Sequence, residues 1–328
     1  MRVIGIDPGT CSFDLFGLGN YREILIDEAI KTEDVLGRPE MLLERVRALL
    51  PLDAIVGPSG YGIPRKKIED MTDEDIGKMI PLDTKLAVNE GIKRLLLKMK
   101  AEALPVFFTP GVVHLPTVPE FRKWNRLDMG TADKVCCVAL AIKDQSERLS
   151  IPFDETSFVL VEVGYAFTAA MAVEGGKITD GIGGTCGSPG FIAGGGMDAE
   201  IAIRLKPPVT QEAVFKGGLR DFIASKESEP EDILSGSEAL RLLGESLEKD
   251  VAALMVSLRK PREIIISGRL ICQDAIQREL FNRFKMYAPV AKVGRISEVA
   301  KEAACGAYLI GEGILGGRYG ALVENMGI

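Results

Sequence analysis

Apolar residues at the start of the chain alternate with glycine-containing turns. This pattern predicts a three-stranded meander, with strands at about residues 2–7, 12–18 and 22–27. The same pattern returns near the middle of the chain. There it predicts strands at about residues 158–163, 167–173 and 177–180, with the hairpin turn Glu174-Gly175-Gly176 before the last strand. The two halves of the chain are therefore expected to begin in the same way.

Each meander is followed by segments with helical periodicity and by short apolar strands. Helices are predicted at about residues 39–50, 84–100, 132–148, 197–205, 210–216, 236–258, 273–284 and 297–315, with Asp83 and Thr131 as N-caps. Buried strands are predicted at about residues 53–57, 105–108, 263–267 and 289–293. Residues 64–80 and 115–130 are expected to be irregular. The predicted class is α/β, with mixed sheets flanked by helices.

The length of 328 residues is too great for one ordinary core and predicts two domains, which we place at 1–155 and 156–328. A hydrophobic content of 46% with 27% charged residues is typical of a soluble globular protein. The net charge of −7, without a basic stripe, argues against nucleic acid as a partner. There is no apolar run of about 18 residues and no signal-peptide pattern, so we expect neither membrane insertion nor export.

The cysteines and the histidine exclude several kinds of site. Six cysteines are scattered without CxxC spacing, which favours free thiols in a reducing cytoplasm over a disulfide framework. The single histidine, His114, excludes zinc and iron sites built on several histidines. A Ser-His-Asp triad would have to use His114, and no GxSxG motif accompanies it. We interpret His114 as a loop histidine.

The turn after the first predicted strand, Asp7-Pro8-Gly9-Thr10, is suited to phosphate. Gly9 allows the backbone to approach a ligand closely, and successive N–H groups in such a turn can form an anion-binding concavity. Thr10 and Ser12 add hydroxyl donors. Asp7, at the end of the strand, is a candidate ligand of Mg²⁺ through water. The alternative is a plain hairpin with an aspartate in its turn.

The first turn of the second meander repeats this arrangement. Glu162 ends a strand in the same acid-x-Gly pattern with Gly164, and Thr168 lies in the strand that follows. Two such turns facing each other would contact one triphosphate from both sides, with Asp7 and Glu162 near the metal ion. A chance duplication of strand, turn and strand is the alternative.

These turns and two later segments resemble the superfamily of actin, sugar kinases, acetate kinases and heat-shock chaperones. The matching segments are Ile4–Leu18, Val159–Val173, Ile264–Leu270 and Glu302–Leu309. The resemblance implies two ribonuclease-H-like (actin-like ATPase) lobes, with ATP and Mg²⁺ in a cleft between them. It also implies that Gly268 flanks the adenosine. More narrowly, the chain is similar to a mainly archaeal family of predicted butyrate kinases, which implies a short-chain carboxylic acid as phosphoryl acceptor.

The sequence departs from the superfamily pattern at both later turns. The second phosphate turn usually reads Asp-x-Gly-Gly, but here it contains Glu162 and Tyr165. Gly268 is followed by Arg269 where two glycines are common. The cleft histidine and arginine residues of established acetate and butyrate kinases have no counterparts at matching places. The sequence therefore supports ATP binding more strongly than phosphorylation of a carboxylate.

A further candidate residue is Asp133, in the first turn of the helix predicted at 132–148. The helix dipole and its N–H groups favour a charged aspartate there, which could accept a proton from a substrate hydroxyl. The run Gly130–Lys134 resembles the Gly-Ala-Asp-Arg segment of bacterial type III pantothenate kinases. That resemblance implies that Asp133 is the base and Lys134 its charge partner. The alternative is that Asp133 only stabilises its helix.

Two other segments are candidates for ligand binding. Residues 181–196 are rich in glycine, and Gly183 and Gly184 would let a nucleotide approach the backbone closely. A flexible surface loop is the alternative. A basic group just before Asp133 could bind an anionic substrate or form a solvated face; it consists of Arg122, Lys123 and Arg126.

The leading functional hypothesis is an ATP-dependent kinase, a transferase acting on a small molecule, with Asp7, Asp133 and Glu162 as catalytic residues. A carboxylate acceptor is already ionised and needs no base, whereas a hydroxyl acceptor would use Asp133. The alternative is a nucleotide-binding switch without a small-molecule acceptor, motivated by the bulk of Tyr165. A homodimer is left open, and no membrane partner is expected.

Overall fold

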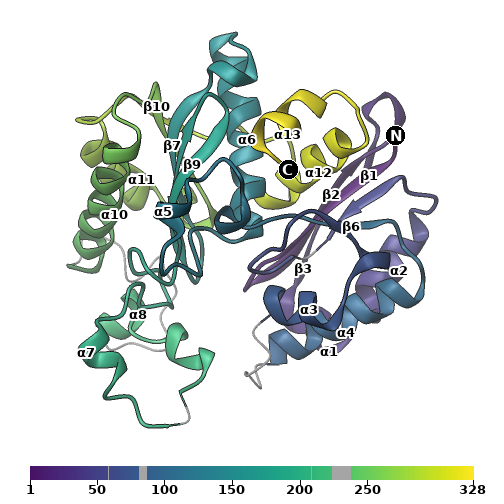
Figure 1. Ribbon diagram of the computed structural model, residues 1–328, viewed down its shortest axis with the longest axis horizontal. Helices are drawn as coiled ribbons and strands as arrows, with labels where there is room; N and C mark the ends of the chain where they lie inside the picture. Colours follow the sequence, from purple (N-terminus) through teal and green to yellow (C-terminus); the bar gives the residue numbers. More distant parts are fainter. Residues whose placement is uncertain (58, 81–86, 208, 224–237) are drawn as a thin grey trace. The chain divides into compact units, whose positions relative to one another are not determined.

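The computed structural model describes residues 1–57, 59–80, 87–207, 209–223 and 238–328. These residues group into two compact units. Unit 1 comprises Met1–Pro116, Thr131–Phe153 and Gly294–Ile328, and unit 2 comprises Thr117–Gly130 and Asp154–Val293. Each unit contains one mixed sheet with helices packed on it (Figure 1). The predicted α/β class is therefore confirmed.

The sheet of unit 1 begins with the predicted meander. Its strands are β1 (Val3–Pro8), β2 (Ser12–Leu18), β3 (Ile24–Lys31), β4 (Ala54–Val56), β5 (Lys66–Lys67) and β6 (Val106–Phe108). The first three are antiparallel neighbours, and β4 and β6 continue the sheet parallel to β1. With β5 at the edge, the strand order is β3-β2-β1-β4-β6-β5. Alternate residues of β1 face opposite sides of this sheet.

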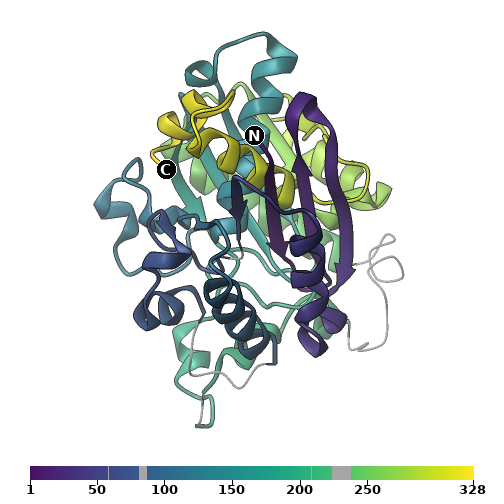
Figure 2. The ribbon, with the colours of Figure 1, turned by 90° about the vertical axis from the view of Figure 1, so that its right-hand side faces the viewer.

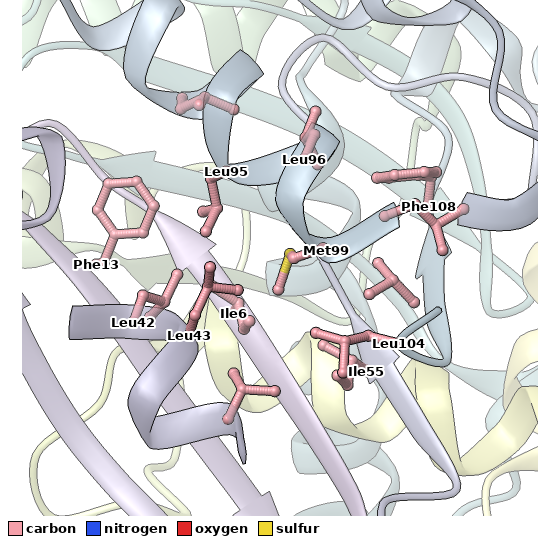
Figure 3. Close-up of a cluster of buried hydrophobic side chains, with 14 of the residues drawn as sticks. Ile6, Phe13, Leu42, Leu43, Ile55, Leu95, Leu96, Met99, Leu104 and Phe108 are labelled. Atoms are coloured by element: carbon pink, nitrogen blue, oxygen red, sulfur yellow. The ribbon is translucent and has the colours of Figure 1, made fainter. Parts of the chain in front are cut away.

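One face of the unit 1 sheet carries α2 (Glu40–Ala48) and α4 (Ala87–Ala101). Figure 3 shows Leu42 and Leu43 of α2 beside Ile6 of β1, all of them buried in one hydrophobic cluster. Burial of each such side chain contributes roughly 1.5–3 kcal/mol. The shorter helices α1 (Thr32–Gly37) and α3 (Asp73–Met79) complete this layer of the unit.

The opposite face carries α12 (Glu302–Ile314), and α6 (Ala132–Leu149) and α13 (Gly320–Met326) pack on α12. The final helices, drawn in yellow, therefore lie against the purple N-terminal strands in Figure 2. Gly5 makes this contact possible, because a Cβ atom there would come 2.3 Å from the carbonyl oxygen of Ala304 in α12. The two ends of the sequence thus pack against each other within unit 1.

The sheet of unit 2 has the same arrangement of a meander and parallel strands as the sheet of unit 1. Its strands are β7 (Ser157–Val163), β8 (Thr168–Glu174), β9 (Lys177–Ile182), β10 (Glu263–Ser267) and β11 (Val290–Lys292), in the order β11-β10-β7-β8-β9. Again an antiparallel meander is extended by parallel strands next to its first strand. The helices are α5 (Glu120–Lys123), α7 (Ala199–Ala202), α8 (Leu219–Phe222), α10 (Glu238–Ser257) and α11 (Asp274–Phe284). The duplicated pattern in the sequence is therefore a duplicated topology.

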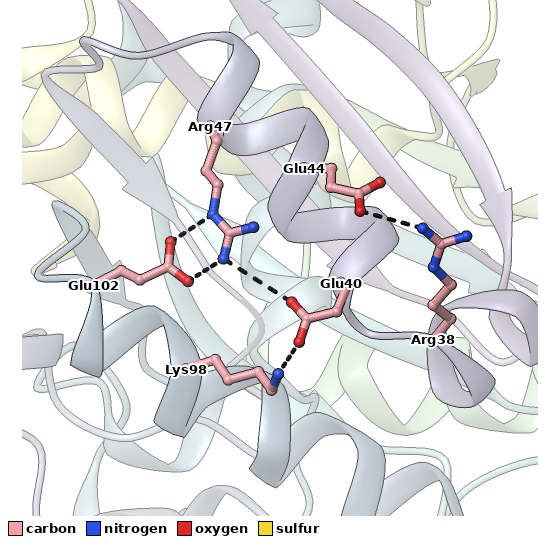
Figure 4. A network of polar contacts seen from close by, with 6 residues as sticks. All are labelled: Arg38, Glu40, Glu44, Arg47, Lys98 and Glu102. Atoms are coloured by element: carbon pink, nitrogen blue, oxygen red, sulfur yellow. Dashed lines mark hydrogen bonds and ion pairs between the residues drawn. The ribbon is translucent and has the colours of Figure 1, made fainter.

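A network of charged side chains ties α2 to the end of α4 on the surface of unit 1 (Figure 4). Arg47 pairs with Glu102 and, at 4.0 Å, with Glu40, which also pairs with Lys98. Exposed pairs of this kind contribute little individually, about 0–1 kcal/mol each. The network lies on the outer side of the helices that cover the hydrophobic cluster.

Several predicted elements differ from the observed ones. Residues 64–80 were expected to be irregular but contain β5 and α3, and α1 was not predicted. The helices expected at 197–205 and 210–216 shrink to α7 and a 3-10 turn at Gln211–Phe215. The last predicted helix, 297–315, begins only at Glu302, because the residues before it form a turn. The predicted cap Asp83 lies outside the described residues.

The hairpin turn of unit 2 is as predicted. Gly175 and Gly176 connect β8 to β9, and Glu174 pairs with Lys177 across the turn. Both glycines have positive φ, at 59° and 67°. Such a turn favours glycine at both positions, because a side chain is strained there.

Candidate functional site

The Asp7 turn of unit 1 is built on a strand end and its partner strand. Asp7 is buried near the end of β1, and it faces Asp14 of β2 in the antiparallel register. Gly9, Thr10 and Cys11 form the connection, with Thr10 exposed. The carbonyl oxygen of Gly9 accepts a hydrogen bond of 2.7 Å from the Thr32 hydroxyl, which fixes the turn against the start of α1.

Ser12 and Asp14 belong to β2, which begins directly after this turn, and both bind Lys301 from near the other end of the sequence. The Ser12 hydroxyl donates to Asp14 Oδ2 at 2.7 Å. Lys301 Nζ lies 2.8 Å from both Ser12 Oγ and Asp14 Oδ2. The Asp14 side chain is almost wholly buried, and Lys301 supplies the charge that such a carboxylate requires. Neither Asp14 nor Lys301 was singled out from the sequence.

Asp133 lies in the first turn of α6, as predicted, and belongs to the same unit as Asp7. It accepts a short hydrogen bond from the Thr131 hydroxyl and pairs with Lys134 at 2.8 Å. Thr131 occupies the N-cap position, although its side chain bonds Asp133 instead of a backbone N–H group. The predicted pairing of Asp133 with Lys134 is therefore present.

The environments of these two carboxyls move their pKa values apart. Burial, followed by the nearby charge of Asp133, raises the pKa of Asp7 to about 7. For Asp133, burial acts upward, but Lys134 and the Thr131 hydroxyl outweigh it and hold the pKa below its usual range. Near neutral pH the Asp133 carboxyl is therefore ionised, whereas the Asp7 carboxyl is partly protonated. Carboxyl groups whose pKa values are shifted away from their ordinary range are common at functional sites.

The Asp7 turn fits Mg²⁺ in its chemistry. Its donors are carboxylate and hydroxyl oxygens, which this ion prefers. Asp14 Oδ1 is buried and has no hydrogen-bond donor within the described part of the chain, so it could accept one from a water bound to the ion. No group of three or more His, Cys, Asp or Glu side chains arranged to hold a metal occurs among the described residues.

The Glu162 turn of unit 2 is the counterpart of the Asp7 turn. Glu162 is buried on β7, where it pairs with Ala169 of β8 and Ser267 of β10. A Cβ atom on Gly164 would come 3.2 Å from Glu162 Oε1, and one on Gly268 would come 2.8 Å from it. The predicted residues Glu162, Gly164 and Gly268 are therefore grouped at one end of the sheet.

Gly268 has a φ of 102°, a conformation that favours glycine, and β10 ends directly before it. The bulky ring of Tyr165 packs on the buried ring of Phe191, with the ring centroids 5.4 Å apart and the ring planes tilted by 51°. The residue that departs most from the superfamily pattern is therefore half-buried against the hydrophobic cluster of unit 2.

The glycine-rich segment 181–196 is fastened to the rest of unit 2. Thr168 Oγ1 donates to the carbonyl oxygen of Ser188 at 2.8 Å, and Ser188 donates through its N–H and hydroxyl to Asp250 of α10. A Cβ atom on Gly190 would come 2.1 Å from the carbonyl oxygen of Ala166. Gly190 is therefore needed for a close contact within the chain, and hydrogen bonds to Thr168 and Asp250 hold the segment in place.

Gly183 and Gly184 lie where other side chains already cover them. Asp128 Oδ2 accepts hydrogen bonds from the backbone and hydroxyl of Thr185, at 3.1 and 3.2 Å. The Asp128 carboxylate covers Gly183, and the ring of Phe167 lies beside Gly184. Asp128 and Asp250, which hold the segment in place, were not singled out from the sequence.

The basic group before Asp133 is largely engaged in unit 2. Arg122 donates to the carbonyl oxygen of Thr179 at 2.7 Å and lies 3.7 Å from Asp180. Lys123 pairs with Glu120 at 2.8 Å. Arg126 is exposed. Arg122 therefore ties the 117–130 segment to β9, and Lys123 pairs within the segment, so neither forms an open anion site.

Solved structures with the same fold include small-molecule kinases. The propionate kinase from Francisella tularensis has a TM-score of 0.66 and 14% identity, covering 94% of this chain and 98% of that chain. The acetate kinase from Porphyromonas gingivalis has a TM-score of 0.61 and 13% identity, covering 87% and 88%. A ROK family glucokinase from Streptomyces griseus, solved with glucose and AMPPNP, has a TM-score of 0.50 and 14% identity, covering 95% and 99%.

At such low identity the likeness shows a shared fold and nothing more. Within that fold the chain belongs to the family described as "Protein of unknown function (DUF1464)", which matches residues 5–328. No curated protein matches the chain. In the described residues, no helix has the length and apolar character needed to cross a bilayer.

Proposed function

We propose that this protein is an ATP-dependent kinase that phosphorylates a short-chain carboxylic acid. The observation that carries the proposal is the Asp7 turn, in which a buried carboxylate at a strand end lies near the charges of Asp133 and Lys301. The fold supports it, because proteins described as acetate and propionate kinases share that fold.

In this proposal the two turns are the phosphate-binding elements of the chain. Gly9, Thr10 and Ser12 would contact phosphate oxygens from unit 1, and Gly164 and Thr168 from unit 2. Asp7 and Glu162 would hold Mg²⁺ through water, and Gly268 would lie beside the adenosine. When bound, Mg²⁺ supplies positive charge to the phosphates. The protein contributes position and preorganised N–H donors.

A carboxylate acceptor attacks the γ-phosphorus with its own negative oxygen, and the bond from that phosphorus to the β-γ bridging oxygen breaks. ADP leaves, and an acyl phosphate forms. No proton has to be removed from the acceptor, so Asp133 is not needed as a base in this case. A hydroxyl acceptor would instead lose its proton to Asp133, whose pKa is held low by Lys134 and Thr131 despite burial.

The experiment is phosphoryl transfer from ATP to acetate, propionate and butyrate, with hydroxylamine trapping of the acyl phosphate. We expect trapped product with at least one acid, and loss of most of it in Asp7→Asn and Asp7→Ala. Asp75→Asn is a matched control, since Asp75 is another buried aspartate of unit 1 but pairs with Lys66 in β5. Full transfer by both Asp7 variants would refute the role of this turn.

The second possibility, a nucleotide switch, gives a different result in the same assay. ATP would then bind and raise the apparent stability of the protein, but no acid or sugar would accept phosphate. Sugar acceptors, beginning with glucose, belong in the assay because a glucokinase shares the fold. Transfer to a sugar and to no acid would contradict the proposed substrate class while leaving the kinase intact.

A further inference from the structure

Lys301 lies in a place that is unfavourable for a lysine unless it has a partner. It occupies the N-cap position of α12 and makes no capping hydrogen bond through its side chain. N-cap positions favour Ser, Thr, Asp and Asn, and the dipole at a helix N-terminus repels a cation. The residue is therefore poorly explained by the needs of its own helix.

A well-defined turn presents this lysine to the Asp7 turn. Asp27 of β3 accepts hydrogen bonds from the residues directly before Lys301. The Ser297 hydroxyl donates at 2.6 Å, the backbone N–H of Glu298 at 2.8 Å and that of Ala300 at 2.7 Å. One carboxylate thus fixes the path of the chain into α12, and the backbone of Lys301 has little freedom.

The ammonium group ends up beside the backbone of the proposed phosphate turn. A Cβ atom on Gly9 would lie 3.3 Å from Lys301 Nζ, so the ammonium occupies the side of the turn that glycine leaves open. Ser12 Oγ and Asp14 Oδ2 each lie 2.8 Å from it. An ammonium has three donors, and these two contacts use two of them. The side chain is 23% exposed, so it remains accessible from outside.

We propose that Lys301 binds a phosphate of the nucleotide at the Asp7 turn through the third N–H donor of its ammonium group. Lys301, which lies near the C-terminal end of the sequence, thereby brings a positive charge to a turn near the N-terminal end. This inference rests on the proposed function, because it requires a nucleotide at that turn. It adds a residue that the sequence did not indicate. Gly9 itself is needed for the backbone of the turn, because a Cβ atom there would come 2.8 Å from the carbonyl oxygen of Ser12.

The test compares nucleotide affinities of Lys301→Met and Lys301→Arg with those of the unaltered protein by calorimetry. The ligands are Mg·ATP, Mg·ADP and adenosine. Removing a charged hydrogen bond to phosphate should weaken Mg·ATP binding roughly ten- to hundredfold in Lys301→Met. Lys301→Arg should retain most of the affinity. Adenosine has no phosphate, so its affinity should be unchanged in both variants.

Lys66→Met is the matched control, because Lys66 also pairs with a buried aspartate of unit 1, at 2.7 Å from Asp75 Oδ2. It should leave the affinity for Mg·ATP unaltered. An equal loss of ATP and adenosine affinity in Lys301→Met would assign Lys301 a structural role and overturn the inference. Unchanged ATP affinity would overturn it as well.

A second measurement uses the unaltered protein and does not depend on a variant that folds. The amines are acetylated with and without nucleotide, and the modification of Lys301 is read by mass spectrometry. We expect Mg·ATP to protect Lys301 and adenosine not to do so; modification that Mg·ATP leaves unchanged contradicts the inference. If the unaltered protein binds no ATP at all, the proposed function fails first. If it binds ATP while Lys301 stays unprotected, only the inference fails.

Discussion

Gly306 of α12 lies directly on the backbone of Cys136 in α6. A Cβ atom on Gly306 would come 1.8 Å from the carbonyl oxygen of Cys136 and 2.4 Å from its carbonyl carbon. The two helices therefore touch backbone to backbone at this point. The contact holds α12 beside the helix whose first turn contains Asp133, and α12 itself begins directly after Lys301.

The first prediction follows from this contact. Gly306→Ala should destabilise the protein by about 3 kcal/mol or more, because the obstacle is backbone and cannot move aside as a side chain would. Gly37→Ala is the control, since a Cβ atom on Gly37 at the end of α1 would meet nothing within 4 Å. It should be neutral or stabilising by up to about 1 kcal/mol. Urea unfolding measures both, and equal effects would contradict the prediction.

A second prediction concerns Asp128 and Gly183 in unit 2. A Cβ atom on Gly183 would come 1.9 Å from Asp128 Oδ1, so Gly183→Ala should be destabilising. In an Asp128→Ala background the obstructing carboxylate is gone, and the same substitution should cost little. The free energies of unfolding of the four proteins in this cycle should deviate from additivity by about 1–3 kcal/mol. Additive effects would show that Asp128 does not control the conformation at Gly183.

The strands of the two meanders could be predicted because the first two strands of each are short and mostly apolar and are joined by a turn that contains glycine. The same pattern located Asp7 and Glu162 at strand ends. Asp14 carried a signal that was overlooked. It is a charged residue inside a strand of otherwise apolar character, and such a residue is buried only with a partner.

That partner could not be found by pattern, since Lys301 lies 287 residues further along and reaches Asp14 only when α12 packs on β1 (301 − 14 = 287). Asp128 was equally out of reach, because it belongs to a proline-punctuated segment without periodicity. The helix α3 was missed for another reason. Its capping box, Thr72 with Asp75, is visible in the sequence, but the charged residues around it mask the weak apolar periodicity.

A third prediction uses the only tryptophan of the chain. Trp124 follows α5 and is 85% exposed, between the exposed residues Phe121 and Leu127. Its fluorescence should therefore be strongly quenched by acrylamide in the native protein, and its emission maximum should move little when urea unfolds the chain. A buried, blue-shifted emission would show that a second copy or another element covers this apolar group in solution.

The last prediction is a pH dependence of stability in the nucleotide-free protein. Asp7 has an ordinary pKa of 3.8 when unfolded, and burial followed by the charge of Asp133 raises it to about 7 in the folded chain. Between these values the folded protein holds a proton that the unfolded chain has released. Stability contributed by this group therefore falls as the pH rises from about 4 to about 7, by about 1–4 kcal/mol.

Asp7→Asn removes the titrating group, so the free energy of unfolding of this variant should lack the decline. Mg·ATP should reduce the decline in the unaltered protein by stabilising the charged carboxylate.

Asp75 provides a control of opposite sign. Lys66 beside it, outweighing partial burial, holds the pKa of Asp75 at about 2, so its contribution is lost as the pH falls from about 4 to about 2. Denaturation by urea at a series of pH values measures both. Identical profiles for Asp7→Asn and the unaltered protein between pH 4 and 7 would mean that Asp7 does not titrate in that range, and would remove the electrostatic basis for a cation at its turn.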